Sequence, residues 1–197
     1  MATKRKPVTQ DFQFVAGNLA LDFVNTVGNR LSERREYFVE ATDVARWARL
    51  AGIVGQSEVL SIKAAQLESL KAAREHLYAL FHKIQSGQAP SNSDLGQIND
   101  MLAEVLPRRQ LKPRSGQVIW EWLGAQTNLA QVLGPVLPSV AELLVSGTCQ
   151  SLRRCEDAEC GWFFIDRSQA HRRRWCSMAD CGNRAKARRF HRGPAKR

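Results

Sequence analysis

The chain has 197 residues, a formal net charge of +10 and a hydrophobic content of 44%. We expect most of it to fold around a core, as one domain or as one domain with a small added module. No apolar run approaches the roughly 18 residues needed to cross a bilayer, so neither a membrane-spanning segment nor a membrane partner is expected. The basic start, Met1–Gln10, has no apolar stretch behind it and is not expected to be a secretory signal. Five cysteines without such a signal favour a reducing, cytoplasmic location, where clustered cysteines more often bind metal than form disulfides.

The positive charge is concentrated in the last part of the sequence. Residues 151–197 contain 13 Lys/Arg against 5 Asp/Glu, whereas the other 150 residues contain 16 against 14. This asymmetry predicts an anionic partner, with nucleic acid as the first candidate. A solvated basic tail that aids solubility is the alternative.

The first predicted element is a short strand or extended entry at Phe12 and Phe14, which alternate with polar residues. From Asn18 the pattern is helical, because apolar residues recur every four positions through Val27. Three further helices are expected over 42–52, 57–87 and 91–107. Their predicted starts are Thr42-Asp43, Ser57 and Ser91, and their predicted ends are Gly52, Gly87 and Pro107.

The residue pattern is no longer helical between Arg109 and Leu123. Two strand-like runs there flank a turn-like segment at 113–116 and predict a β-hairpin. A last helical pattern follows from Asn128 and is expected to be interrupted by Pro135 and Pro138. The predicted fold class is therefore mainly α with a small β-hairpin, and the helical domain is expected to span residues 1–147.

Four cysteines have the spacing of a metal site. Four residues separate Cys155 from Cys160, four separate Cys176 from Cys181, and fifteen lie between the pairs. Two tight turns that each offer two thiolates meet the tetrahedral demand of structural zinc. We therefore predict one Zn²⁺ per chain, held by these four residues. Reduced or disulfide-bonded pairs without metal are the alternative, and His171 or His191 could replace one cysteine.

The predicted module around this site covers residues 148–197 and is treble-clef-like or ribbon-like. Its expected elements are a strand at Gly161–Asp166, a returning strand at Arg172–Trp175 and a basic helix after Cys181. So small a module buries little apolar surface, so metal is expected to supply much of its folding energy, with Trp162 and Trp175 as a miniature core. Cys149 lies outside the symmetric set and is expected to pack as a small hydrophobe.

Two stretches resemble known families. The sequence RRWCSMADCGNRAKARR at Arg173–Arg189 resembles the CGNR zinc finger, named for the motif that stands here at Cys181–Arg184. The segment GNLALDFVNT at Gly17–Thr26 is similar to the start of the ABATE domain that precedes this finger. The resemblance implies that the four cysteines are the zinc ligands. It also implies a bacterial cytoplasmic protein that acts as a stress-induced transcription regulator or binds RNA.

The basic residues of the module are the candidate nucleic-acid contacts. Arginines on a short helix and an adjacent turn suit bidentate contacts to phosphate, and Asn183 or Arg184 could reach a base edge. In the alternative, Arg173 and Arg174 stack on the tryptophans and Asn183 supports a turn. DNA is expected ahead of RNA. The candidate residues are Arg172, Arg173, Arg174, Asn183, Arg184, Lys186, Arg188 and Arg189.

A polar line on the first predicted helix is a candidate ligand pocket. Asn18, Asp22, Asn25 and Asn29 fall at i, i+4, i+7 and i+11, and the first three could orient a small-molecule effector that controls the finger. A solvated face or a buried hydrogen-bonded network is the alternative. Arg30, Arg34, Arg35 and Arg46 are candidate partners for Asp22.

No phosphate-cradling glycine loop, HExxH or GxSxG pattern is present in the sequence, and four protein ligands leave zinc no open position, so no enzyme is expected. The favoured function is a zinc-containing nucleic-acid-binding regulator. The alternatives are a protein–protein adaptor with a purely structural zinc module and a small-molecule sensor. The oligomeric state is not predicted.

Overall fold

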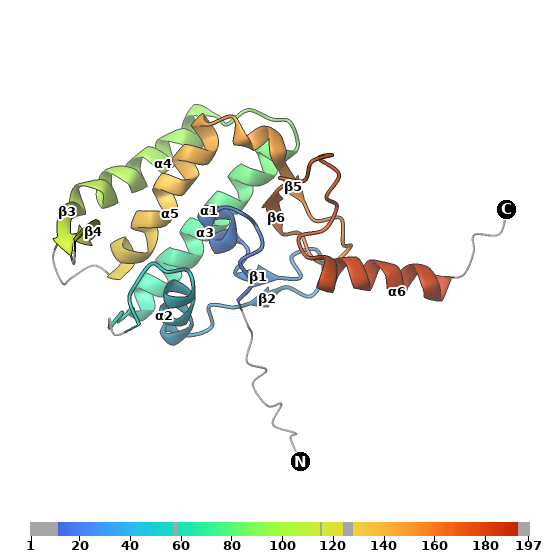
Figure 1. Cartoon of the computed structure of the whole chain (residues 1–197), viewed down its shortest axis with the longest axis horizontal. Coiled ribbons are helices and arrows are strands. Elements are labelled where there is room, and N and C mark those ends of the chain that lie inside the picture. Colours follow the sequence, from blue (N-terminus) through green and yellow to red (C-terminus); the bar gives the residue numbers. More distant parts are fainter. Residues whose placement is uncertain (1–11, 57–58, 115, 124–127, 193–197) are drawn as a thin grey trace, which may run out of the picture.

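The computed structural model describes residues 12–56, 59–114, 116–123 and 128–192. Helices dominate this part of the chain, and three two-stranded antiparallel sheets accompany them (Figure 1). None of the described helices is long and apolar enough to cross a membrane. In chain order the elements are α1 (Leu19–Val24), β1 (Val27–Gly28), β2 (Arg35–Glu36), α2 (Ala41–Leu50), α3 (Ala64–Gln85), α4 (Asn92–Val105), β3 (Arg109–Arg114), β4 (Gln117–Trp122), α5 (Asn128–Val145), β5 (Leu152–Arg154), β6 (Phe163–Ile165) and α6 (Asn183–Arg192).

The helical body is built from α3, α4 and α5, with α1 packed against α3 and α5 (Figure 1). Five of the six residues of α1 are buried, so this short helix lies in the core and not on the surface. Its N-terminus is capped by the Asn18 side chain, which accepts from the backbone N–H groups of Ala20 and Leu21.

The first predicted helix is shorter than expected. It ends at Val24, and Val27 pairs with Glu36 in the β1–β2 ladder instead of continuing the helical face. The cause is a tertiary contact, because the Asn25 side chain bonds to both backbone groups of Phe163 in β6. Asn29 consequently lies beyond the helix, with a positive φ of 48°.

Two predicted helix starts were also misplaced. Helix α2 begins after Glu40, where Asp43 caps the backbone N–H of Glu40 from inside the first turn. Helix α3 begins at Ala64; Ser57 lies outside the described residues. Before α3, Leu60 and Ile62 are buried while Val59 is exposed, an alternation typical of extended chain. The start at Ser91 is confirmed, because its hydroxyl accepts from Asp94 N–H.

The hairpin prediction is confirmed, with β3 and β4 in register from Arg109 opposite Trp122 to Arg114 opposite Gln117. The expected interruption at Pro135 and Pro138 is wrong, because α5 runs through both. Each proline removes one backbone donor, but Val132, Val136, Leu137 and Val140 between and around them are fully buried. Packing of this face outweighs the local preference.

The cysteine-bearing module is part of the same hydrophobic core as the helices. Phe163, Phe164 and Ile165 of β6 are buried, and Ile165 N–H donates to the Ala16 carbonyl at 2.8 Å. Trp162 donates from Nε1 to the Val27 carbonyl at 2.7 Å and meets the Tyr37 ring edge-on. Trp162 and Trp175, expected to form a miniature core, instead pack within and against the core that the finger shares with the body.

Candidate metal centre and its basic helix

The four predicted cysteines meet at one point. Their Sγ atoms lie within 4.8 Å of one another, and all four residues are buried. Cys176 Sγ lies 3.6 Å from the Sγ atoms of both Cys160 and Cys181. Neither His171 nor His191 belongs to this cluster.

The sulfur geometry fits a zinc ion. A tetrahedron with Zn–S bonds of about 2.3 Å has sulfur–sulfur edges of about 3.8 Å, whereas a disulfide would need about 2.05 Å. The hydrogen bonds among the thiols lower the pKa of Cys155 and raise the pKa of Cys160 and Cys176, and burial raises the latter two further, so without a cation Cys160 and Cys176 stay protonated. A divalent ion reverses this balance because it binds thiolates. The four cysteines are thus positioned to hold one Zn²⁺.

Local chain geometry explains how the ligands converge. Cys155 follows β5, and Cys160 precedes Gly161, which has a φ of 73° and leads into β6. A Cβ at Gly161 would lie 3.0 Å from the Arg30 Cβ, so both the turn and the close approach require glycine. Cys181 lies in a π-helical turn at Met178–Gly182 that opens directly into α6.

The strand partner in this module differs from the prediction. Leu152–Arg154 pairs with Phe163–Ile165, whereas Arg172–Trp175 forms no strand. Asp166 explains the different path, because it accepts from the N–H groups of Ser168 and Arg173 and so holds that segment in a loop. The predicted helix after Cys181 is confirmed as α6.

Asp157, which is not among the residues predicted for the site, connects the metal centre to α6. Its side chain is fully buried, and it accepts from Arg184 Nε at 3.3 Å and from Arg188 Nη2. Arg184 also donates from Nη2 to Cys181 Sγ at 3.0 Å, and Arg188 pairs with Glu159 at 3.3 Å. The sequence does contain a signal for this role, because Asp157 and Glu159 lie between Cys155 and Cys160 in an otherwise basic segment.

The predicted nucleic-acid residues fall into two groups. Most already make intramolecular contacts: Arg173 donates to the Val15 and Trp175 carbonyls and lies 4.3 Å over the Phe164 ring. Arg174 pairs with Glu156 at 2.6 Å, and Asn183 donates to the Ala179 carbonyl. The second group is exposed and makes no side-chain hydrogen bond or ion pair within the described part of the chain. It consists of Arg172, Lys186 and Arg189.

The polar line near the N-terminus is a structural network. Asn18 caps α1, Asp22 accepts from Ala16 N–H at 3.0 Å, and Asn25 joins β6 at 2.8 and 3.0 Å. This geometry supports the buried-network alternative. Three of the four arginines expected as partners for Asp22 pair elsewhere, Arg30 and Arg34 with Glu75 and Arg46 with Asp43. Burial accordingly raises the pKa of Asp22 to about 6.

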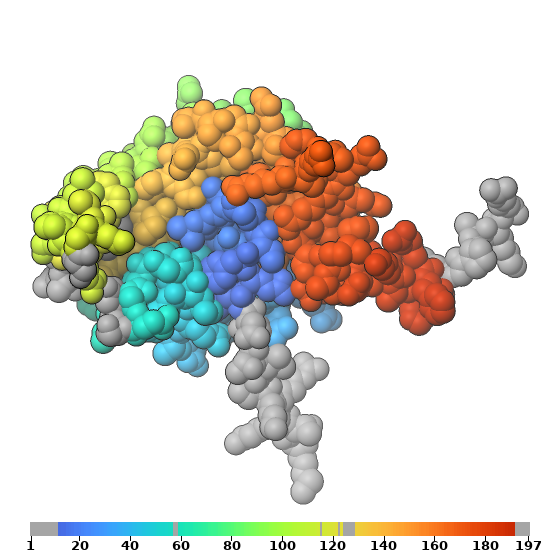
Figure 2. All heavy atoms as spheres, in the orientation of Figure 1, coloured from blue at the N-terminus to red at the C-terminus, as the bar shows by residue number. Residues whose placement is uncertain are grey.

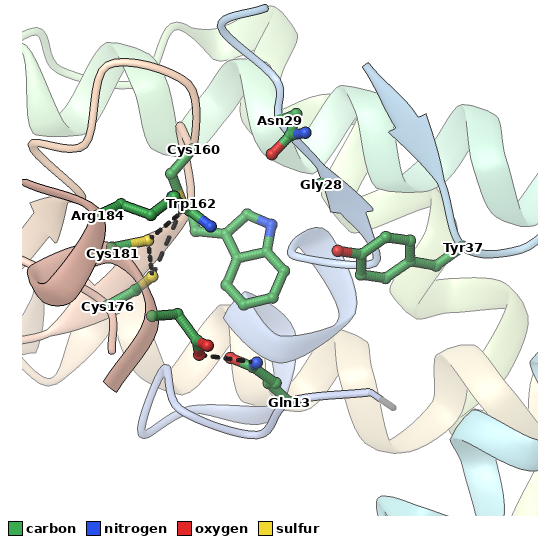
Figure 3. Close-up of a pocket in the computed structure, with 10 residues that line it drawn as sticks. Gln13, Gly28, Asn29, Tyr37, Cys160, Trp162, Cys176, Cys181 and Arg184 are labelled. Atoms are coloured by element: carbon green, nitrogen blue, oxygen red, sulfur yellow. Dashed lines mark hydrogen bonds between the residues drawn. The ribbon is translucent and has the colours of Figure 1, made fainter. Parts of the chain in front are cut away.

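A hollow of about 120 Å³ opens beside the cysteines (Figure 3). The Trp162 indole lies between the cysteines and the Tyr37 ring, and Asn29 lies at the rim. Asn18, Asp22 and Asn25 do not line it. Cys149, the fifth cysteine, lies apart, where its thiol donates to the Leu143 carbonyl and burial raises its pKa.

Fold and site together define a helical domain that carries a four-cysteine zinc finger with a basic helix. The family model of the CGNR zinc finger matches residues 151–192. The ABATE model, described as "Putative stress-induced transcription regulator", matches residues 17–147. The chain belongs to the ABATE family, with a CGNR zinc finger as its second part. No curated protein matches it.

Proposed function

We propose that the protein is a cytoplasmic transcription regulator whose zinc finger presents α6 to nucleic acid, with DNA as the target. The observation that carries this proposal is the composition and position of α6. Five of its ten residues are Lys or Arg and none is acidic. The helix projects from the body at the end opposite the β3–β4 hairpin (Figures 1 and 2). An accessible basic helix of this kind suits the phosphate-lined grooves of a duplex.

The structure changes which residues are expected to touch phosphate. Arg184 and Arg188 are held by Asp157 and therefore anchor the helix to the zinc knuckle. Lys186 and Arg189 are exposed and make no ion pair with the described residues, so they can bind an anion. The metal centre favours a structural role for zinc. Four thiolates fill its coordination shell and leave no position for a catalytic water. We therefore propose a structural zinc and no enzymatic activity.

The test is the salt dependence of binding to duplex DNA, measured by fluorescence anisotropy on zinc-loaded protein. Each phosphate contact contributes about −0.9 to the slope of log K against log salt. Changing Lys186 and Arg189 together to Ala should make this negative slope less steep by about two units and leave the zinc content unchanged.

The matched control changes Lys112 and Arg114 of the hairpin to Ala, which removes the same charge at the far end of the molecule. This variant should keep the wild-type slope. If the wild-type protein binds neither duplex DNA nor RNA at low salt, an adaptor function replaces the proposed one.

The adaptor is the second candidate because one face of the hairpin is apolar and exposed. Leu111, Val118 and Trp120 share that face and are 60%, 69% and 53% exposed. A small-molecule effector is not part of the proposal, because the side chains expected to line its pocket are engaged in hydrogen bonds with the backbone.

A further inference from the structure

We propose that the cavity between α6 and Trp175 binds one unpaired nucleotide, with its base stacked on the Trp175–Arg174 pair and its phosphate held by Arg189. The proposal rests on the proposed function and narrows its target to a strand with at least one unpaired base.

The cavity is a surface pocket of about 310 Å³ on the side of α6 that faces the loop before Cys176. This volume lies at the lower end of the range of small-ligand pockets, which begins at about 300 Å³. Its lining combines one tryptophan with three arginines and a single acidic residue, Glu156. Aromatic and guanidinium planes of this kind are the groups on which single-stranded nucleic acids stack.

The stacking platform is preorganised. The guanidinium of Arg174 lies over the Trp175 ring at 5.0 Å, and Glu156 holds that guanidinium at 2.6 Å. Trp175 is half-buried against the core, so its indole is fixed by its neighbours. A planar base can extend this pair at little conformational cost, since the protein groups are already ordered.

The arginines that line the cavity are not equivalent. Arg188 is neutralised by Asp157 and Glu159, both of which belong to the zinc knuckle. Arg189 also lines the cavity and makes no ion pair with the described residues, so it is the cation available to a phosphate. A ligand therefore needs a flat apolar group and an adjacent anion, which is the chemistry of a nucleotide.

The need for an unpaired base follows from duplex geometry. In a double helix each base is stacked on its neighbours, and only an edge is offered to a protein. A base can reach the Trp175–Arg174 pair from a single strand or after it leaves the stack. Oligo(dT) and oligo(U) should therefore bind through this cavity, and the two probes distinguish DNA from RNA as the source of the nucleotide.

The experiment compares zinc-loaded wild-type protein with the Trp175→Leu variant on oligo(dT), oligo(U) and blunt duplex DNA at low salt. Loss of the stack should weaken binding to at least one single-stranded probe by about 5- to 150-fold, the range for one stacked base. Duplex binding should change little. Trp120→Leu is the control, because Trp120 also carries a stacked arginine, Arg109 at 4.1 Å, but is exposed on the remote hairpin.

A second measurement needs no variant. An abasic strand of the same length keeps the phosphates and lacks the bases, so the wild-type protein should bind it more weakly than oligo(dT) by a similar factor. Equal binding of abasic and normal strands overturns the proposal, as does wild-type affinity in a zinc-loaded Trp175→Leu variant. Failure of the wild-type protein to bind any probe overturns the proposed function itself, whereas binding to the duplex alone overturns only the nucleotide site.

Discussion

Two buried carboxylates, Asp22 and Asp157, lie in opposite electrostatic surroundings. Asp157 accepts from two arginines of α6, whereas the partners of Asp22 within the described part of the chain are backbone N–H groups. A carboxylate without a nearby cation is costly to ionise when buried. Replacing Asp22 should therefore change how stability depends on pH, whereas replacing Asp157 should release two arginines of α6.

Asp22 should make the stability of the protein depend on pH. Its folded pKa of about 6 exceeds the ordinary value of 3.8 because of burial. Between these values the folded state keeps a proton that the unfolded state has lost, so the free energy of unfolding falls as pH rises. The loss from this group is about 3 kcal/mol and is complete above pH about 6. Other carboxylates such as Glu75 titrate in both proteins, so urea unfolding across this window should show wild type losing about 3 kcal/mol relative to Asp22→Asn as pH rises; parallel curves would contradict the assignment.

Asp157 should affect the metal centre without touching the metal. Removing its charge in Asp157→Asn frees Arg184, which donates to Cys181 Sγ, and loosens α6. Replacing a residue that supports a metal ligand through hydrogen bonds typically lowers metal affinity by about 10- to 100-fold. Competition with a chelator should show weaker zinc retention in Asp157→Asn. Glu156→Gln, which breaks only the surface pair with Arg174, is the control and should retain zinc like wild type.

At the scale of helices and strands, the elements predicted correctly are those whose determinants are local in the sequence. The Ser91 cap, the hairpin at 109–123 and the basic helix after Cys181 each follow from residues within a few positions. The cysteine cluster was predictable because ligand type and spacing encode it. The errors came from contacts between distant segments: Asn25 ends α1 through β6, and packing carries α5 through two prolines. For the basic residues, composition revealed the charge but not which arginines Asp157 neutralises.

The two hydrogen bonds between Asn25, which follows α1, and Phe163 of β6 should contribute to the stability of the fold. Asn25→Ala leaves the buried N–H and carbonyl of Phe163 without their side-chain partner. Two such groups at about 1–3 kcal/mol each should lower the free energy of unfolding by about 2–6 kcal/mol. Asn183→Ala is the comparison, because Asn183 makes a similar bond on the exposed face of α6 and should cost less than about 1 kcal/mol. Equal losses in chemical denaturation would remove the structural role of Asn25.

At the scale of the whole molecule, finger and helical body are connected by both packing and charge. Arg30 donates from its backbone to the Cys160 carbonyl and from its side chain to Val24 and Glu75. Burial would raise the pKa of Glu75, but the hydrogen bonds and charge of Arg30, with the charges of Arg74 and Arg34, hold it at about 2. The metal centre thus lies against the core of the body. Loss of the metal should therefore also make α1 and β1 less ordered.

The central claim is that zinc organises the finger as part of one core and so holds α6 in place. Hydrogen exchange measured by mass spectrometry on zinc-loaded and chelator-treated protein tests it most directly. The protein should contain one zinc per chain before treatment. After chelation, faster exchange should appear in Leu152–Arg192 and also in Leu19–Gly28, whose partners Phe163 and Trp162 belong to the finger. Faster exchange confined to residues 152–192, with Leu19–Gly28 unchanged, would contradict it.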